Sequence, residues 1–260
     1  MLVDSHCHIP MLGQDMEVDE VIANAKVLGV EHMLCVSVDL ETYPEILSLA
    51  EQYDCIYASV GVHPNTRLQE EVSHETLVQL ASNNNVIAIG ETGLDYFRSE
   101  GDLDWQRERF RTHIRAAKSV NKPLIIHTRD VGEDITRILQ EESANEVGGV
   151  MHCFVEDWEI AQKAMELNFY ISFSGIVTFK NAKEVQEVAK QVPLERMLVE
   201  TDSPYLTPAP YRGRPNQPGY TRYVAEFIAE LHGTSLEQVA EQTTANFFKL
   251  FKINKRDFKL

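Results

Sequence analysis

The segment Leu2-Val3-Asp4-Ser5-His6-Cys7-His8 opens with two apolar residues and closes on two histidines. In a β-strand alternate side chains share one face, so His6 and His8 point together while Cys7 points away. The segment therefore predicts a strand that ends on two adjacent imidazoles. A single pair of this kind is a weak signal for a metal site, because histidines also occur as hydrogen-bonded core residues.

Further apolar runs along the chain also predict strands, and most of them end on a residue with metal-binding or phosphate-binding chemistry. The eight predicted strands span residues 2–8, 33–38, 56–63, 86–91, 123–129, 149–154, 169–174 and 197–202. The chemical residues at their ends are His6, His8, His63, Glu91, His127, His152 and Asp202. This repetition gives the first histidine pair its significance.

Segments with helical spacing separate these runs, for example the one that contains Val21, Ala25 and Leu28. Alternating strands and helices predict parallel strands covered by helices, and hence an α/β fold. We expect a (β/α)8 TIM barrel with a binuclear metal site at its C-terminal mouth, where all strand ends meet. An open doubly wound sheet is the alternative, but such a sheet usually carries its chemistry at one switch point.

Composition agrees with a single TIM-barrel domain over residues 1–260, since such barrels have about 250 residues. No apolar stretch approaches the roughly 20 residues that a membrane span needs, and no signal segment opens the chain. We therefore expect a cytoplasmic protein without membrane association, and no obligate protein partner is indicated. The cysteines lack a CxxC spacing and should be reduced; they are Cys7, Cys35, Cys55 and Cys153.

The net charge of −16 argues against non-specific binding of nucleic acid, which needs a basic footprint. Two stretches, 109–129 and 203–225, nevertheless contain no acidic residue. The first is mostly a predicted helix, so its basic residues should form a solvated outer face. The second is a proline-rich loop after Asp202, where Arg212 and Arg214 can grip a phosphate through bidentate contacts.

Six of the strand-end residues offer four imidazoles and two carboxylates, which is more than one cation normally uses. Two divalent cations would divide them well if one carboxylate is shared. We assign Glu91 as the shared ligand and Asp202 as the acceptor of a proton from the attacking water. Such mixed ligands suit magnesium, manganese, zinc or nickel alike. The complete predicted ligand set is His6, His8, Glu91, His127, His152 and Asp202.

Neighbouring residues should support this set. Asp4 shares a face with His6 and can accept the other ring N–H of an imidazole, and Glu200 stands in the same relation to Asp202. Arg129 should hold either a core carboxylate or a substrate phosphate, and His63 should contact substrate or a ligand. The remaining histidines fall in predicted helices or loops and are not expected to bind metal: His32, His74, His113 and His232.

Six motifs run in order along the chain. They are Val3-Asp4-Ser5-His6-Cys7-His8, Val60-Gly61-Val62-His63-Pro64, Ile89-Gly90-Glu91-Thr92-Gly93-Leu94-Asp95-Tyr96, Ile126-His127-Thr128-Arg129, His152-Cys153-Phe154 and Glu200-Thr201-Asp202-Ser203-Pro204-Tyr205-Leu206. Together they resemble the TatD family of metal-dependent deoxyribonucleases, over essentially the whole chain. The resemblance implies a barrel in which His6, His8, Glu91 and Asp202 surround one metal, and Glu91, His127 and His152 the other. The family commonly has glutamate where this chain has Gln217, which puts an acidic role there in doubt.

Three functions stay open at this point. The first is two-metal hydrolysis of phosphodiester bonds in DNA, with RNA as a further possible substrate. The second is hydrolysis of a carboxylic ester or amide, such as an aminoacyl nucleic acid or a cyclic amide, by the same ions. Many barrels of the second kind use a carboxylated lysine where this chain has Glu91, which favours the first function. The third, binding of metal or a partner without catalysis, fits least well with an intact ligand set.

Overall fold

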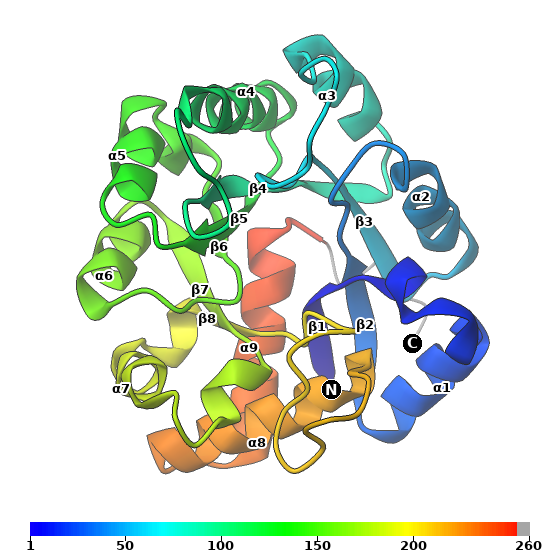
Figure 1. Cartoon of the computed structure of the whole chain (residues 1–260). Helices are drawn as coiled ribbons and strands as arrows, with labels where there is room; N and C mark the ends of the chain where they lie inside the picture. The colour runs from blue at the N-terminus through cyan, green and yellow to red at the C-terminus, as the bar shows by residue number, and fades with distance from the viewer. Residues whose placement is uncertain (254–260) are drawn as a thin grey trace.

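The computed structural model describes residues 1–253, and at its centre eight parallel strands stand side by side in chain order (Figure 1). The strands are β1 (Leu2–Cys7), β2 (Val30–Cys35), β3 (Ile56–Val60), β4 (Val86–Asp95), β5 (Leu124–Arg129), β6 (Gly149–Met151), β7 (Phe169–Phe173) and β8 (Met197–Val199). The chain just beyond β8 returns to β1: the backbone N–H of Asp202 donates to the carbonyl of His6 at 2.9 Å. This contact nearly closes the sheet, and the predicted (β/α)8 barrel is confirmed.

Most of the helices form a ring around the strands, whereas the last one, α9, is seen at the centre of that ring (Figure 1). The α-helices are α1 (Val18–Val27), α2 (Tyr43–Gln52), α3 (His74–Ala81), α4 (Asp104–Val120), α5 (Asp134–Glu141), α6 (Trp158–Glu166), α7 (Lys183–Gln191), α8 (Thr221–His232) and α9 (Leu236–Leu250). Short 3-10 segments are η1 (Ile9–Asp15), η2 (Ala144–Glu146), η3 (Gly175–Thr178), η4 (Leu194–Arg196) and η5 (Pro218–Tyr220). No helix within residues 1–253 is long and apolar enough to cross a membrane.

Two apolar layers hold the barrel together. The larger one lies between the strands and the surrounding helices. The smaller one joins strand residues such as Val3, Ile125 and Leu198 to Phe247 and Phe251 at the end of α9. Burying apolar side chains from β1, β5, β8 and α9 against each other fills the inside of the barrel near its N-terminal end. The polar strand-end residues are thereby left to the opposite end.

The eight strands lie where they were predicted, but several boundaries differ: β3 and β6, for example, end at Val60 and Met151, three residues earlier than predicted. Three further differences bear on the site. First, β2 begins at Val30, so His32 lies in a strand, and its predicted place in a helix or loop is wrong. Second, β4 continues past Glu91 to Asp95. Third, β8 ends at Val199, because the next backbone groups bond outside the β8 ladder; the N–H of Thr201, for example, donates to the Asp4 carboxylate at 2.9 Å.

Gly93 allows β4 to continue. Its φ is 135°, a conformation that residues with a side chain rarely adopt, and a Cβ at this position would collide with the carbonyl oxygen of His127. The β4–β5 register pairs Gly93 with His127 and Asp95 with Arg129. Because the strands run together this far, Asp95 reaches the level of His127.

All four cysteines are free thiols, as predicted.

Candidate metal centre

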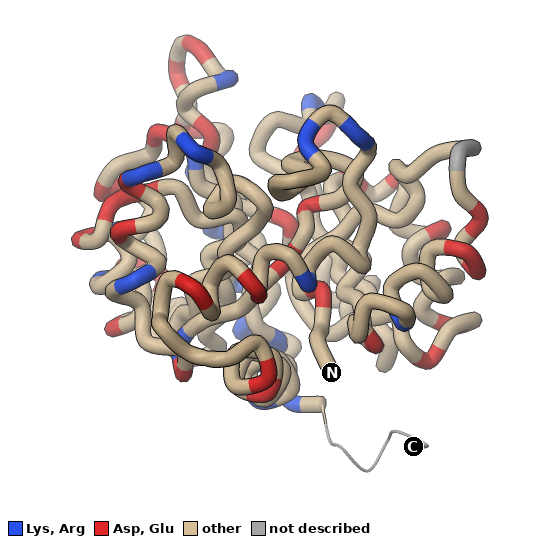
Figure 2. Tube along the Cα trace, turned by 90° about the horizontal axis from the view of Figure 1, so that it is seen from below, with Lys and Arg blue, Asp and Glu red and all other residues tan. Residues whose placement is uncertain are grey.

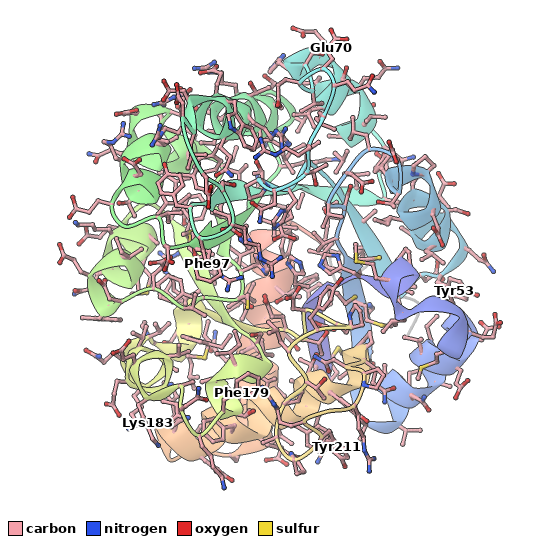
Figure 3. All side chains as sticks on the ribbon, in the orientation of Figure 1. Tyr53, Glu70, Phe97, Phe179, Lys183 and Tyr211 are labelled. Atoms are coloured by element: carbon pink, nitrogen blue, oxygen red, sulfur yellow. The ribbon has the colours of Figure 1, made fainter. Side chains whose placement is uncertain are left out.

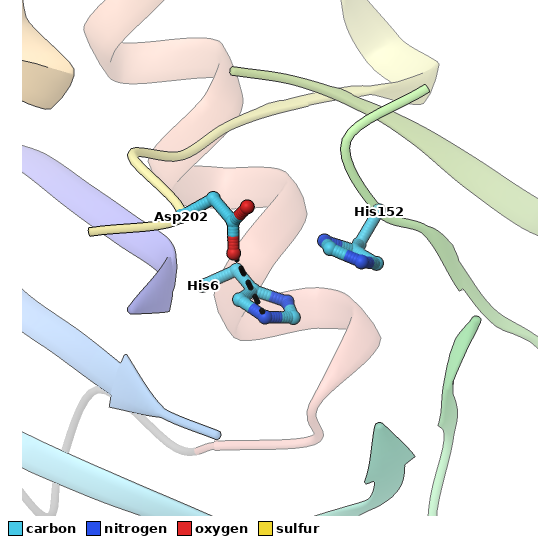
Figure 4. Close-up of side chains that lie close together, drawn as sticks. All are labelled: His6, His152 and Asp202. Atoms are coloured by element: carbon cyan, nitrogen blue, oxygen red, sulfur yellow. Dashed lines mark ion pairs between the residues drawn. The ribbon is translucent and has the colours of Figure 1, made fainter. Parts of the chain in front are cut away.

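The strand-end residues converge at the C-terminal mouth of the barrel. Three overlapping groups place their possible ligand atoms within 4.8 Å of one another. These groups are His6 with His152 and Asp202, His6 with His8 and Glu91, and His63 with Glu91 and His127. Figure 4 shows the first group, in which the rings of His6 and His152 stack with centroids 3.9 Å apart. The predicted convergence is thus present in the fold.

Glu91 lies between two sets of histidines, and each of its carboxylate oxygens faces one set. Oε2 lies 3.4 Å from Nε2 of His6 and 4.0 Å from Nε2 of His8. Oε1 lies 2.9 Å from Nδ1 of His127 and 2.8 Å from Nε2 of His152. This carboxylate is almost fully buried, with 3% of its side chain exposed. One carboxylate therefore reaches both sets of histidines.

Asp202 completes the set that includes the first two histidines. Its Oδ1 lies 3.3 Å from Nε2 of His8 and 3.7 Å from Nε2 of His6. The Asp202 side chain is 16% exposed, so it is more open to solvent than Glu91. Burial raises the pKa of Asp202, but the neighbouring imidazoles lower it further, and the net pKa falls below the usual value. Asp202 is therefore ionised and accessible from the mouth.

Asp4 supports Asp202 in a different way from the one predicted. Its Oδ2 accepts from the hydroxyl of Thr201 at 2.6 Å, and its Oδ1 accepts from the backbone N–H of Thr201 at 2.9 Å and that of His6 at 3.3 Å. The predicted contact of Asp4 with an imidazole N–H is wrong, because these backbone and hydroxyl donors occupy the carboxylate. Asp4 instead holds the residue that precedes Asp202.

Three histidines each have one ring nitrogen in contact with an acceptor, which fixes where the ring proton lies. The contacts are His8 Nδ1 to the carbonyl of Val36 at 3.0 Å, His127 Nε2 to Asp95 at 3.2 Å, and His152 Nδ1 to Glu200 at 3.2 Å. In each ring the nitrogen that carries the proton donates it to this acceptor. The other nitrogen of each ring points toward Glu91 or Asp202, where it can hold either a second proton or a metal cation.

The lone pair of an imidazole nitrogen and a nearby carboxylate repel each other unless a proton or a metal cation lies between them. Nε2 of His152 is buried and has no hydrogen-bond partner within residues 1–253, although it lies 2.8 Å from Glu91. Burial lowers the pKa of His152, but the carboxylates of Glu91 and Glu200 raise it more, to well above its usual value. The site therefore attracts a cation, and its imidazole and carboxylate donors fit divalent metal ions.

Glu200 lies beside the centre as predicted, and its partner is His152. Oε1 of Glu200 also accepts from the backbone N–H of Cys153 at 2.8 Å. The carboxylate is fully buried. It is placed to hold the His152 ring in one orientation, as carboxylates beside metal-binding histidines do.

Asp95 was not among the predicted site residues, and it contacts His127. Its side chain is buried and accepts from the side chain of Asn65 at 2.7 Å as well as from the backbone N–H of Arg98 at 2.9 Å. Burial raises the pKa of Asp95, but these donors and His127 lower it further, so the net pKa is far below the usual value. A signal was present in the sequence, because Glu91, Gly93 and Asp95 alternate along one strand face.

His63 lies at the edge of the centre, on the chain that follows β3. Its Nε2 is 3.4 Å from Oε1 of Glu91 and 3.3 Å from Nδ1 of His127. Burial lowers the pKa of His63 to about 3, so the ring is neutral. His63 therefore touches the predicted ligands directly, which is one of the two contacts that the sequence suggested.

The three arginines predicted to meet substrate stack on aromatic rings (Figure 3 labels Phe97, Phe179 and Tyr211). The guanidinium of Arg129 lies 4.0 Å from the centroid of Phe97, a ring that is 60% exposed. Arg212 lies 3.7 Å from the centroid of Phe179, and Arg214 lies 5.9 Å from that of Tyr211. Arg212 and Arg214 are exposed, and stacking leaves the edge of a guanidinium free to donate.

In the other acid-free stretch, 109–129, Arg115 is exposed and Arg111 is half-buried, whereas Arg109 is buried. These basic residues on α4 pair with acids from other parts of the chain: Arg109 with Glu71 at 2.7 Å, Arg111 with Glu141 at 2.6 Å, and Arg115 with Glu142 at 2.7 Å. Figure 2 shows Lys and Arg interspersed with Asp and Glu over the molecule. These arginines are neutralised by their partners, which leaves the loop after β8 as the better place for an anion.

Comparison with known proteins gives consistent matches over nearly the whole chain. Residues 3–252 match the family model described as TatD related DNase. The chain is 46% identical over 257 residues to the uncharacterized metal-dependent hydrolase YabD of Bacillus subtilis, covering 98% of this chain and 100% of that protein. It is also 46% identical over 256 residues to the uncharacterized metal-dependent hydrolase YcfH of Escherichia coli, covering 97% of this chain and 96% of that protein.

A solved structure extends this similarity to the fold. YJJV, a TatD homolog from Escherichia coli, matches with a TM-score of 0.89 at 27% identity, covering 97% of this chain and 98% of that chain. The strand-end residues thus belong to an architecture that recurs in these relatives.

Proposed function

The chain is a metal-dependent hydrolase that belongs to the TatD-related DNase family, and we propose that it cleaves phosphodiester bonds in DNA with two bound divalent cations. The observation that carries the proposal is the orientation of Glu91. Its two oxygens face separate sets of imidazoles, so one carboxylate can serve two cations at once. Two cations held this close suit the displacement of an oxygen at phosphorus, because both attacking and leaving oxygens need stabilisation.

The proposed ligands are those that the family resemblance implies, and their distances to Glu91 and Asp202 fit that assignment. His6, His8, Glu91 and Asp202 hold one cation, and Glu91, His127 and His152 hold the other. When bound, such cations supply a water of lowered pKa as nucleophile and withdraw charge from the group under attack. Glu200 and Asp95 keep the rings of His152 and His127 turned toward the centre. Magnesium, manganese, zinc and nickel all remain compatible with this donor set.

Asp202 is the proposed acceptor of the proton that the attacking water loses. Its carboxylate is ionised, partly exposed and attached to the closing contact between β1 and the chain after β8. Asp4 holds the preceding residue, Thr201, by two hydrogen bonds. This support restricts the direction in which Asp202 can point, which general base catalysis requires.

Arg212 and Arg214 are the proposed contacts to the phosphates that flank the scissile bond. Both belong to the exposed, acid-free loop after β8. Arg129, which is the last residue of β5 and stacks on Phe97, is a third candidate. On a chain with net charge −16, local basic residues are needed to offset the repulsion of a nucleic acid.

The proposal is tested with metal-free protein reconstituted separately with magnesium, manganese, zinc and nickel. Each form is assayed on end-labelled single-stranded DNA, duplex DNA, RNA, a cyclic amide and an aminoacyl ester. We expect cleavage of DNA to exceed that of the amide and the ester. Faster hydrolysis of the amide or the ester would contradict the proposal and would indicate attack at a carbonyl carbon by the same centre.

A further inference from the structure

We propose that His63 presents an N–H group to the scissile group of the substrate and is not a ligand of either cation. The proposal rests on the hydrolytic function proposed above, and it concerns a residue whose Nε2 lies 3.4 Å from Glu91, as that of His6 does. The distances alone allow His63, Glu91 and His127 to hold a metal ion together. The hydrogen bonds of the His63 ring decide against that arrangement.

Nδ1 of His63 is a hydrogen-bond acceptor. The backbone N–H of Asn65 donates to this nitrogen at 3.0 Å. A backbone amide can only donate, so Nδ1 must offer a lone pair and carries no proton. The neutral ring therefore has its proton on Nε2, and a nitrogen that carries a proton has no lone pair for a metal.

Nε2 of His63 faces two atoms of the candidate metal centre. It lies 3.3 Å from Nδ1 of His127 and 3.4 Å from Oε1 of Glu91, and both atoms are acceptors. Nδ1 of His127 is an acceptor because Nε2 of that ring faces the Asp95 carboxylate at 3.2 Å. Two adjacent imidazoles thus have opposite roles: His127 presents a lone pair to the centre, and His63 presents an N–H.

Asn65 links the two assignments. Its backbone N–H fixes the proton of His63, and its side-chain Nδ2 donates to Oδ2 of Asp95 at 2.7 Å. The same Asp95 oxygen faces the ring of His127. Asn65 thus contacts both the His63 ring and the Asp95 carboxylate that faces His127, so the donor role of His63 and the acceptor role of His127 depend on the same residue. Asn65 and Asp95 are therefore positioning residues for this pair of histidines.

The chain that carries His63 is held in place by buried side chains of α4. Arg109 donates to the carbonyl of His63 at 3.0 Å, and Gln106 donates to the carbonyl of Pro64 at 3.2 Å. Nε2 of His113 accepts from the backbone N–H of Val62 at 3.0 Å. Such contacts on successive residues fix the backbone, and the His63 N–H is oriented before any substrate arrives.

A fixed N–H at this place has a clear use in hydrolysis. The His63 side chain is 17% exposed, so its edge is accessible from the mouth. Negative charge on the oxygens of the scissile group increases as the nucleophile attacks. A donor that is already oriented stabilises this charge without the cost of reorganisation, and removal of one such donor lowers kcat about 100-fold.

Nitrogen NMR of the histidine rings in the full chain tests the proton assignment directly. Spectra are recorded for metal-free and zinc-loaded protein. We expect Nε2 of His63 to carry the proton in both forms. His113 is the internal reference with the opposite assignment, since its Nδ1 donates to the carbonyl of Arg109 at 2.8 Å. A His63 proton on Nδ1, or zinc bound to Nε2 of His63, would overturn the proposal.

Two variants test the role in catalysis. His63→Phe keeps a ring but removes the N–H, and we expect zinc stoichiometry and KM to stay the same while kcat falls about 100-fold. His63→Gln restores an N–H donor and should recover part of kcat. Loss of one zinc ion in His63→Phe, or kcat unchanged in that variant, refutes the proposal; if His63→Phe does not fold, the NMR result still decides whether His63 is a ligand.

The same experiments separate this proposal from the proposed function. If the loaded protein cleaves an ester or amide but no phosphodiester, the DNA proposal fails, and kcat of the two variants is measured on that ester or amide. If it cleaves DNA while zinc binds His63, the DNA proposal stands and the donor role fails.

Discussion

Oδ2 of Asp95 lies 3.2 Å from Nε2 of His127, while Nδ1 of the same ring lies 2.9 Å from Glu91. The Asp95 carboxylate therefore accepts a hydrogen bond from Nε2–H of His127. The other ring nitrogen, Nδ1, points into the candidate metal centre and is available to a cation. The pKa of Asp95 is far below its usual value, so the carboxylate is charged and can only accept. This relationship makes Asp95 a residue that determines whether His127 can bind a cation.

Asp95→Ala should weaken the cation position that includes His127, because the ring loses the acceptor that fixes its proton. We expect affinity at that position to fall about 10-fold to 100-fold, with little change at the position of His6 and His8. Calorimetric titration with zinc measures the two affinities. Glu187→Ala, which removes an acid paired with Lys190 on α7, is the control and should titrate as wild type. Equal weakening of both positions would contradict this role for Asp95.

The two proposed cation positions should lose their ions in different variants. Metal analysis of the native protein should approach two ions per chain, in line with the shared position of Glu91. His6→Ala with His8→Ala should remove mainly one ion, and His127→Ala with His152→Ala mainly the other. A wild-type stoichiometry that stays at one ion in saturating metal rules out the binuclear centre.

Glu91→Gln should abolish most activity while the fold survives. The amide has nearly the same shape as the carboxylate but lacks the charge that allows two cations to lie close together. Activity on the preferred substrate and circular dichroism spectra measure the two effects. His74→Ala at the start of α3 is the control, since its side chain contacts Ser119 and Glu75 on the surface. The assignment fails if Glu91→Gln and His74→Ala are equally active.

Arg212→Ala with Arg214→Ala should raise KM for oligonucleotides and flatten its dependence on salt. Each phosphate contact that is lost should lower the salt slope by about one unit. Metal content and hydrolysis of a small aryl phosphodiester should stay nearly unchanged. Lys163→Ala with Lys190→Ala removes the same charge from surface ion pairs on α6 and α7 and is the control. A wild-type salt slope in the first double variant would mean that this loop does not contact the phosphates.

His113 should make stability depend on pH. Burial lowers its pKa from the usual 6.5 to about 4 in the folded chain. The unfolded chain therefore binds this proton first as pH falls, so the stabilisation is complete above pH 6.5 and is lost toward pH 4, by about 3 kcal/mol in all.

Denaturant unfolding of wild type and His113→Gln measures this effect at equal metal content. Between about pH 7.5 and about pH 5, the difference in free energy of unfolding between the two proteins should shrink by about 2 kcal/mol. A difference that stays constant over this range would show that His113 is not held neutral by the fold.

The eight strands and the convergence of six chemical residues could be predicted from the sequence, because both follow from local rules. Side chains alternate along a strand, and parallel strands that alternate with helices bring their C-terminal ends to one mouth. The residues at which the strands begin and end could be predicted less well than the strands themselves. β2 begins at Val30 with the polar residues Glu31 and His32, and pairing with β1 overrides their weak strand propensity.

Asp95 was missed for a related reason. The apolar run that predicts β4 ends at Glu91, and the strand continues only because Gly93 can approach the backbone of His127. The partner of Asp4 could not be predicted either, because Thr201 lies 197 residues away in the chain. Contacts at that separation depend on how the barrel closes.

The protonation pattern of the imidazoles depends on the folded backbone: the contact that fixes His63 is local, and the contact that fixes His127 comes from a neighbouring strand. His63 and His127 both end predicted strands and look alike in the sequence. Folding brings the backbone amide of Asn65 to one ring and the carboxylate of Asp95 to the other. A donor on one ring and an acceptor on the other leave the two histidines with opposite free groups. Residue type and spacing determine which side chains meet at the mouth, whereas the hydrogen-bond partners that the folded backbone brings to each ring determine what each of them offers there.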